Sequence, residues 1–171
     1  MTIAGDSGGG NLTLATALKA KRDGHLHMVN GACALVPLIS NDWASTKTTG
    51  APRFPSLIEN DGYVLACEAM DINAAVLDPS GTHATDPLCW PLHASDEDLA
   101  GLPPHLISVN ELDPLRDEGI AYYRNLTRAG VSAHLQTVPG MSHGADLMFP
   151  TQMPDRYQAA VDCIYDFAVS I

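Results

Sequence analysis

Positively charged side chains are scarce in this sequence. Its 171 residues include 9 lysines and arginines against 20 aspartates and glutamates, which gives a formal net charge of -11. Nucleic acids and anionic membrane surfaces are bound by cationic faces, and a chain this acidic does not provide one. The composition therefore predicts no nucleic-acid partner, and it identifies no substrate.

Long hydrophobic runs are also missing. The longest apolar stretch, residues 32–39, is far shorter than the roughly 20 residues that a membrane-spanning helix needs, and Pro37 interrupts it. Residues 1–10 contain neither the basic segment nor the apolar core of a secretory signal peptide. The sequence therefore predicts a soluble, cytoplasmic protein without a membrane span.

The cysteines lack the spacing of metal ligands. None stands in a Cys-x-x-Cys pair, and no histidine lies at zinc-finger distance from them. His25 and His27 alternate as on a strand, but no third ligand is near, so they are predicted to be surface residues and not a metal pair. Apolar neighbours predict four buried free thiols, at Cys33, Cys67, Cys89 and Cys163.

Strand-like and helix-like segments alternate along the chain, a pattern typical of an α/β protein with a mainly parallel sheet. We predict strands at residues 1–4, 28–35, 106–109 and 134–138. Helices are predicted at residues 9–22, 63–77, 116–129 and 155–169, with a single capped turn at 95–98. Residues 41–60 and 83–104 are predicted to be long connections, and residues 1–171 to form one domain.

Residues 5–9 (GDSGG) fit the pattern Gly-x-Ser-x-Gly between a predicted strand and a predicted helix. On such a turn the hydroxyl of Ser7 stands above the sheet as a nucleophile, and the flanking glycines allow a crowded backbone. The amide of Gly8 would then face a developing oxyanion. Taken alone, the pattern also fits a glycine-rich turn that holds a phosphate.

A nucleophilic serine needs a base and an orienting carboxylate, which follow in this fold class in the order Ser, Asp, His. Asp113 lies just after the predicted third strand, and His143 lies in the loop after the fourth. Both are therefore expected at the same edge of the sheet as Ser7. Glu111 and Asp117 stand close enough in sequence to replace Asp113 as the carboxylate.

Five segments together carry a family resemblance. Residues 5–12 (GDSGGGNL), 113–119 (DPLRDEG) and 140–145 (GMSHGA) resemble the hormone-sensitive-lipase-like (family IV) carboxylesterases of the α/β-hydrolase superfamily. Residues 57–63 (LIENDGY) and 101–104 (GLPP) look closest to the brefeldin A esterase branch. The resemblance runs nearly end to end and corresponds to the carboxyl-terminal part of an α/β-hydrolase fold.

The resemblance implies a serine hydrolase that cleaves small-molecule carboxylic esters through an acyl-enzyme, without a cofactor. Ser7 is then the nucleophile, His143 the general base and acid, and Asp113 its carboxylate partner. An acyltransferase or amidase of the same fold remains an alternative. Large apolar side chains fit an acyl pocket or the core equally well, namely Trp43, Trp90, Met141, Met148 and Phe149, and Asp42 is a further pocket candidate.

Full-length members of that family carry an upstream His-Gly-Gly loop with oxyanion donors, and no His-Gly-Gly occurs in these 171 residues. Gly8 is the single donor that the motif names, and loss of one donor typically costs about 100- to 1,000-fold in rate. We therefore expect a fragment or truncated product whose first strand leaves an open sheet edge available for self-association. A non-catalytic remnant that serves as an interaction module is the alternative to an enzyme.

Overall fold

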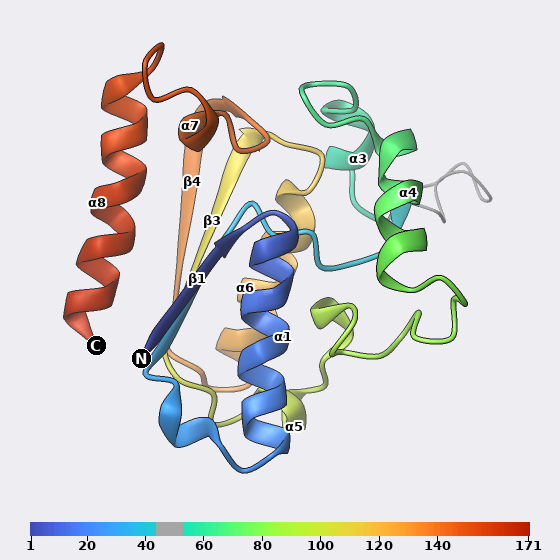
Figure 1. Ribbon diagram of the computed structural model, residues 1–171, viewed down its shortest axis with the longest axis vertical. Coiled ribbons are helices and arrows are strands. Elements are labelled where there is room, and N and C mark those ends of the chain that lie inside the picture. Colours follow the sequence, from blue (N-terminus) through green and yellow to red (C-terminus); the bar gives the residue numbers. More distant parts are fainter. Residues whose placement is uncertain (44–52) are drawn as a thin grey trace.

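The computed structural model describes residues 1–43 and 53–171. Four parallel strands form one sheet in the order β1 (Thr2–Asp6), β2 (Gly31–Leu35), β3 (His105–Leu112) and β4 (Ala133–Ser142). Helices cover both faces of this sheet (Figure 1). The α/β class with a mainly parallel sheet is thus confirmed, and the carboxyl ends of all four strands meet at one edge.

Two helices pack on one face of the sheet and one on the other. Helices α1 (Gly8–Arg22) and α6 (Arg116–Arg128) lie together, and α8 (Pro154–Ser170) lies on the opposite side (Figure 1). The main core forms under α1 and α6, where Leu14 and Tyr122 are fully buried. Every residue of β2 is buried, because both faces of that strand are covered.

The connections contain short elements. These are η1 (Leu26–Met28), α3 (Ser56–Glu59), α4 (Cys67–Leu77), η2 (Pro91–His93), α5 (Asp96–Leu99) and α7 (Ala145–Met148). The predicted turn at 95–98 is α5, closed by a capping box between Ser95 and Asp98. Part of the predicted connection at 41–60 lies outside the described residues.

Strand boundaries differ from the prediction in a way that matters for the site. Residues 28–30 are not in a strand, because Met28 ends the exposed 3₁₀ turn η1. Strands β3 and β4 both run several residues further than the apolar runs suggest. After an irregularity beyond Asn110, Leu112 pairs with Ser142. The residues that follow, Asp113 and His143, therefore leave the sheet side by side.

The four cysteines are free thiols. Cys33 and Cys89 are buried as predicted, whereas Cys67 and Cys163 are only partly buried. Among the described residues β1 pairs with β2 alone, so its outer backbone edge is open, and self-association there stays a prediction. No helix in the described ranges is long and apolar enough to span a membrane.

Candidate active site

Ser7 occupies the one-residue turn between β1 and α1. Its φ of 52° lies in the left-handed region that side chains other than glycine rarely adopt. Neighbouring backbone holds this conformation: the Ser7 amide donates to the Leu35 carbonyl at 2.9 Å, and the Ser7 carbonyl accepts from the Leu38 amide at 3.1 Å. The turn is thus fixed by the end of β2 and the segment that follows it, and the hydroxyl faces Nε2 of His143.

Glycine is required at two positions around this turn. A Cβ on Gly5 would lie 2.4 Å from the carbonyl oxygen of Gly9, and a Cβ on Gly10 would lie 2.9 Å from Cβ of Pro37. In contrast, a Cβ on Gly8 would meet nothing within 4 Å. The crowding expected of the motif therefore comes from the strand and from the first turn of the helix, not from the residue after the serine.

Asn11 ties the start of α1 to two connections. Its side-chain amide is buried and donates to the carbonyl of Leu38 at 2.8 Å and to that of Cys89 at 2.9 Å. The segment after β2 is thereby held against the nucleophile turn from two sides. No sequence pattern predicts a role for Asn11 beyond its place in the motif, because its partners are backbone carbonyls far along the chain.

The structure brings Ser7, His143 and Asp113 into one hydrogen-bonded line. Nε2 of His143 lies 2.9 Å from Oγ of Ser7, and Nδ1 lies 2.9 Å from Oδ2 of Asp113. The other carboxylate oxygen of Asp113 accepts from the Leu115 amide at 2.9 Å. Asp113 is fully buried, so its carboxylate and the imidazole face each other away from water.

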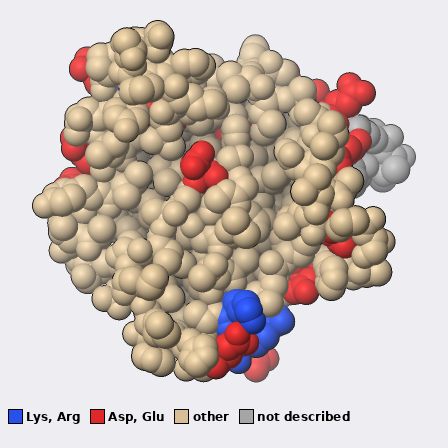
Figure 2. Space-filling model, in the orientation of Figure 1, with Lys and Arg blue, Asp and Glu red and all other residues tan. Residues whose placement is uncertain are grey.

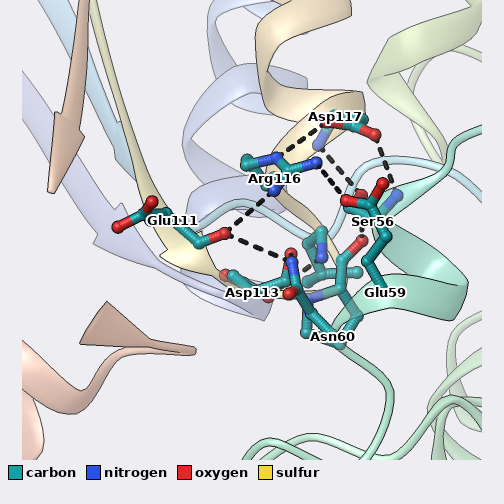
Figure 3. A network of polar contacts seen from close by, with 9 residues as sticks. Ser56, Glu59, Asn60, Glu111, Asp113, Arg116 and Asp117 are labelled. Atoms are coloured by element: carbon teal, nitrogen blue, oxygen red, sulfur yellow. Dashed lines mark hydrogen bonds and ion pairs between the residues drawn. The ribbon is translucent and has the colours of Figure 1, made fainter. Parts of the chain in front are cut away.

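Glu111 and Asp117, the two alternatives to Asp113, point elsewhere (Figure 3). The carboxylate of Glu111 accepts from the Gly140 amide at 2.7 Å. That of Asp117 accepts from the Ser56 amide and from Nε of Arg116, both at 2.9 Å. Asp113 alone of the three contacts His143, and the other two brace the loops on either side of it.

Glu118 is a buried carboxyl that the sequence did not single out. It is 1% exposed, and its two oxygens accept from the Ile39 amide at 2.7 Å and from the Ser40 hydroxyl at 2.6 Å. Burial raises the pKa of Glu118 from 4.5 to about 8, against the opposing effect of these hydrogen bonds. A largely neutral carboxyl thus joins α6 to the segment that holds Ser7.

The free energy of unfolding is expected to fall as the pH rises from 6.5 to 8. The folded protein keeps the Glu118 proton up to about pH 8, whereas the unfolded chain releases it near 4.5. The stabilisation is therefore complete below the unfolded pKa and is lost as the pH rises through the folded pKa. One such proton changes the unfolding free energy by about 1.4 kcal/mol per pH unit, which urea titrations at several pH values measure.

The window starts at pH 6.5 because His105 acts in the opposite direction below it. Burial lowers the pKa of His105 from 6.5 to about 4. The contribution of neutral His105 to the unfolding free energy is therefore lost as the pH falls from 6.5 towards 4. Glu118→Gln has nearly the same shape and no titrating group, and it is expected to flatten the slope above pH 6.5. Equal slopes in both proteins would contradict the assignment.

A cavity of about 490 Å³ opens in front of Ser7. Its lining combines the nucleophile turn with apolar side chains from two helices, namely Ser7, Gly8, Asn11, Leu12, Leu38, Asn73, Val76 and Leu77. Leu12 and Val76 are 62% and 76% exposed, which leaves apolar surface next to the hydroxyl. The sequence missed α4 as a cavity wall because nothing in its pattern shows where the helix docks.

The large apolar side chains that fit either a pocket or the core in the sequence do not line the cavity at Ser7. Trp43 and Trp90 are buried and pack edge to face, with ring centroids 5.6 Å apart. Neither lines the cavity at Ser7, so the core alternative is correct for both. Met141, Met148 and Phe149 do not line it either, and Asp42 pairs with Arg53 at 3.2 Å.

Charge is unevenly spread over the molecular surface. On the face shown in Figure 2, Lys and Arg gather in one patch at the lower edge, and Asp and Glu occur in several places. Most of that face carries neither charge. The apolar part of the cavity lining at Ser7 favours a ligand whose bound part is uncharged.

Comparison with known proteins shows which family the chain belongs to. It matches the alpha/beta hydrolase fold family over residues 1–147. It is 38% identical over 147 residues to the carboxylesterase NlhH of Mycobacterium tuberculosis, and 34% identical over 145 residues to the carboxylic ester hydrolase LipN of the same species. Among solved structures it is similar to brefeldin A esterase, a bacterial homologue of human hormone sensitive lipase, with a TM-score of 0.92 and 44% identity. The structure of esterase Est22 gives a TM-score of 0.81 and 43% identity.

These matches cover most of this chain and less than half of each relative. The alignments include 84% of this chain but 43% of NlhH and 37% of LipN. The superpositions include 98% and 97% of this chain, and 46% of both brefeldin A esterase and Est22. The chain thus spans less than half the length of these relatives.

Proposed function

Since this chain belongs to the hormone-sensitive-lipase-like branch of the α/β hydrolase fold family, we propose that it carries the catalytic residues of a serine carboxylesterase. The observation that carries the proposal is the line of Ser7, His143 and Asp113, with 2.9 Å at both joints. The substrates are small-molecule carboxylic esters, by analogy with the named activities of the relatives.

Each residue of the line has a distinct task. Because a carboxylate oxygen only accepts, Asp113 accepts a hydrogen bond from the Nδ1–H of His143, which keeps the proton on Nδ1 and leaves Nε2 free to accept the Ser7 proton. Ser7 Oγ then attacks the ester carbonyl, and the imidazolium returns its proton to the leaving alkoxide. Water then gives a proton to His143 and attacks the acyl-enzyme in the same way, which releases the carboxylic acid and restores Ser7.

Gly8 is the proposed oxyanion donor. It begins α1, so its backbone N–H lies at the positive end of a helix of 15 residues and beside the cavity in front of Ser7. The sequence contains no His-Gly-Gly segment to supply further donors. We therefore expect acylation by an activated ester to be easier to detect than turnover of an unactivated one.

Hydrolysis of p-nitrophenyl acetate by the purified chain tests the proposal. A burst of p-nitrophenol equal to the protein concentration is expected, followed by slower steady-state release, because acylation by this activated ester is expected to be faster than attack of water on the acyl-enzyme. The rate is expected to depend on pH, because an imidazole that already carries two protons cannot accept the Ser7 proton. A flat profile between pH 5 and 8 would contradict His143 as the base.

Product analysis separates the related activities. Acetic acid as the sole acyl product supports an esterase, whereas acetyl transfer to an added alcohol in preference to water would identify an acyltransferase. Cleavage of the matching p-nitroanilide at a comparable rate would identify an amidase. If the folded protein released p-nitrophenol neither as a burst nor in the steady state, the chain would lack the proposed activity.

A further inference from the structure

Asn60 contacts the loop that carries Asp113 from outside the line of catalytic residues. It follows α3, is 4% exposed, and points its side-chain amide at the loop (Figure 3). That amide donates to the carbonyl of Glu111 at 3.2 Å and to the carbonyl of Asp113 at 3.1 Å. One side chain thus serves two backbone carbonyls next to the carboxylate, that of the buried Asp113 and that of the exposed Glu111, which also accepts from Nη1 of Arg116 at 3.1 Å.

The direction of the Asp113 carboxylate depends on this backbone. Both carboxylate oxygens are already engaged, one with the Leu115 amide and the other with His143. A shift of the Asp113 Cα would therefore displace the oxygen that faces His143. The Asn60 side-chain amide holds this backbone through the carbonyls of Glu111 and Asp113.

Asn60 is itself held rigidly. Its backbone amide donates to the Ser56 carbonyl at 3.1 Å. Ser56 in turn donates its hydroxyl to the Pro114 carbonyl at 2.7 Å, and its amide donates to the carboxylate of Asp117. Ser56 and Asn60 thus fasten α3 to residues 111–117, the segment around Asp113 that we call the acid loop (Figure 3).

We propose that Asn60 is a positioning residue that holds Asp113 in line with Nδ1 of His143. A primary amide suits this task because its two N–H groups serve two carbonyls at once. An aspartate has nearly the same shape but would face both carbonyls with acceptors. The proposal rests on the proposed function for its kinetic consequence, and on the Asp113–His143 hydrogen bond for its structural one.

Kinetics of Asn60→Ala and Asn60→Asp test the first consequence. We expect kcat for p-nitrophenyl acetate to fall about 10- to 100-fold with KM within about twofold, because a small displacement of a catalytic group slows chemistry more than binding. Asn30→Ala is the matched control, since Asn30 is exposed at the far edge of the sheet. Val131→Ala, a core change far from the acid loop, controls for lost stability. An unchanged kcat in either Asn60 variant, or an equal loss in Val131→Ala, would overturn the proposal.

Proton NMR tests the second consequence without relying on activity. The Nδ1–H of a histidine bonded to a carboxylate gives a far-downfield resonance, which we expect in the wild type and in both controls. It should be lost or strongly broadened in the Asn60 variants. Suppose that the wild type takes up no fluorophosphonate label, but that the resonance is present in it and is lost in Asn60→Ala. This result would refute the proposed function and support the positioning role.

Two results would refute the positioning role outright. One is the absence of the resonance in the wild type, since Asp113 and His143 would then not be joined in solution. The other applies if neither variant folds: the side-chain amide protons of Asn60 are expected to exchange slowly in the wild type, and fast exchange would show that the two bonds are not maintained.

Discussion

Replacement of Ser7 by alanine is expected to abolish labelling of the protein by a fluorophosphonate and to lower ester hydrolysis by about 10⁴- to 10⁶-fold. The hydroxyl is the only part of Ser7 that the change removes, and it lies 2.9 Å from the nitrogen that would take its proton. Peptide mapping of the labelled wild type should place the whole label on Ser7. Loss of the hydroxyl should leave the backbone bonds of Ser7 to β2 in place.

Ser170→Ala is the control for that experiment, because Ser170 is exposed at the end of α8 and far from the turn. It should label as the wild type does. If another residue of Ser7→Ala took up the label, that residue and not Ser7 would be the nucleophile. A folded wild type that takes up no label would leave the family relationship unchanged and would make this chain a non-catalytic member.

Asp113→Asn is expected to lower kcat by about 10⁴-fold while the protein stays folded. The amide has nearly the size of the carboxylate, but it offers an N–H where the Nδ1 proton of His143 now finds an acceptor. The imidazole would then turn to its other tautomer, and Nε2 would carry a proton where it has to accept one. Steady-state kinetics with p-nitrophenyl acetate and a circular-dichroism melt check the two halves of the statement.

Glu111→Gln and Asp117→Asn are the matched comparisons. Each removes a carboxylate close to Asp113 in sequence, at the end of β3 or the start of α6, without touching His143, so we expect losses of less than about tenfold. A loss in either variant as large as that of Asp113→Asn would mean that the loop rearranges in solution. It would also reopen the choice among the three carboxylates.

Much of the fold was predictable because the signals that carry it are local. Apolar periodicity and glycine stops gave α1, α6 and α8 to within a few residues, and the strand–turn–helix context of Ser7 followed from residues 1–12. The late parts of β3 and β4 were not predictable in this way. Their residues, including Pro139 and Gly140, have no strand pattern, and pairing with a neighbour keeps them extended.

The site divides in the same way. Chain order, loop position and the family resemblance together selected Ser7, Asp113 and His143, which the structure brings together. Loop position alone left Glu111 and Asp117 open as the carboxylate. Asn11, Asn60 and Glu118 were missed because each acts on backbone groups that are distant in sequence. A buried amide or carboxyl at such a position has no sequence signature, since Asn60 stands between Glu59 and Asp61, and Glu118 follows Asp117.

The pairing of Leu112 with Ser142 limits how this protein tolerates changes in chain length. Asp113 and His143 each stand one residue beyond that pair, so inserting or deleting a single residue in either strand would send one of the two side chains to the opposite side of the sheet. Gly130 to Ser132, the link between α6 and β4 at the far edge, carries no such constraint. Length variation in a lineage of such proteins should therefore accumulate at that far edge and stay rare between each strand and its catalytic residue.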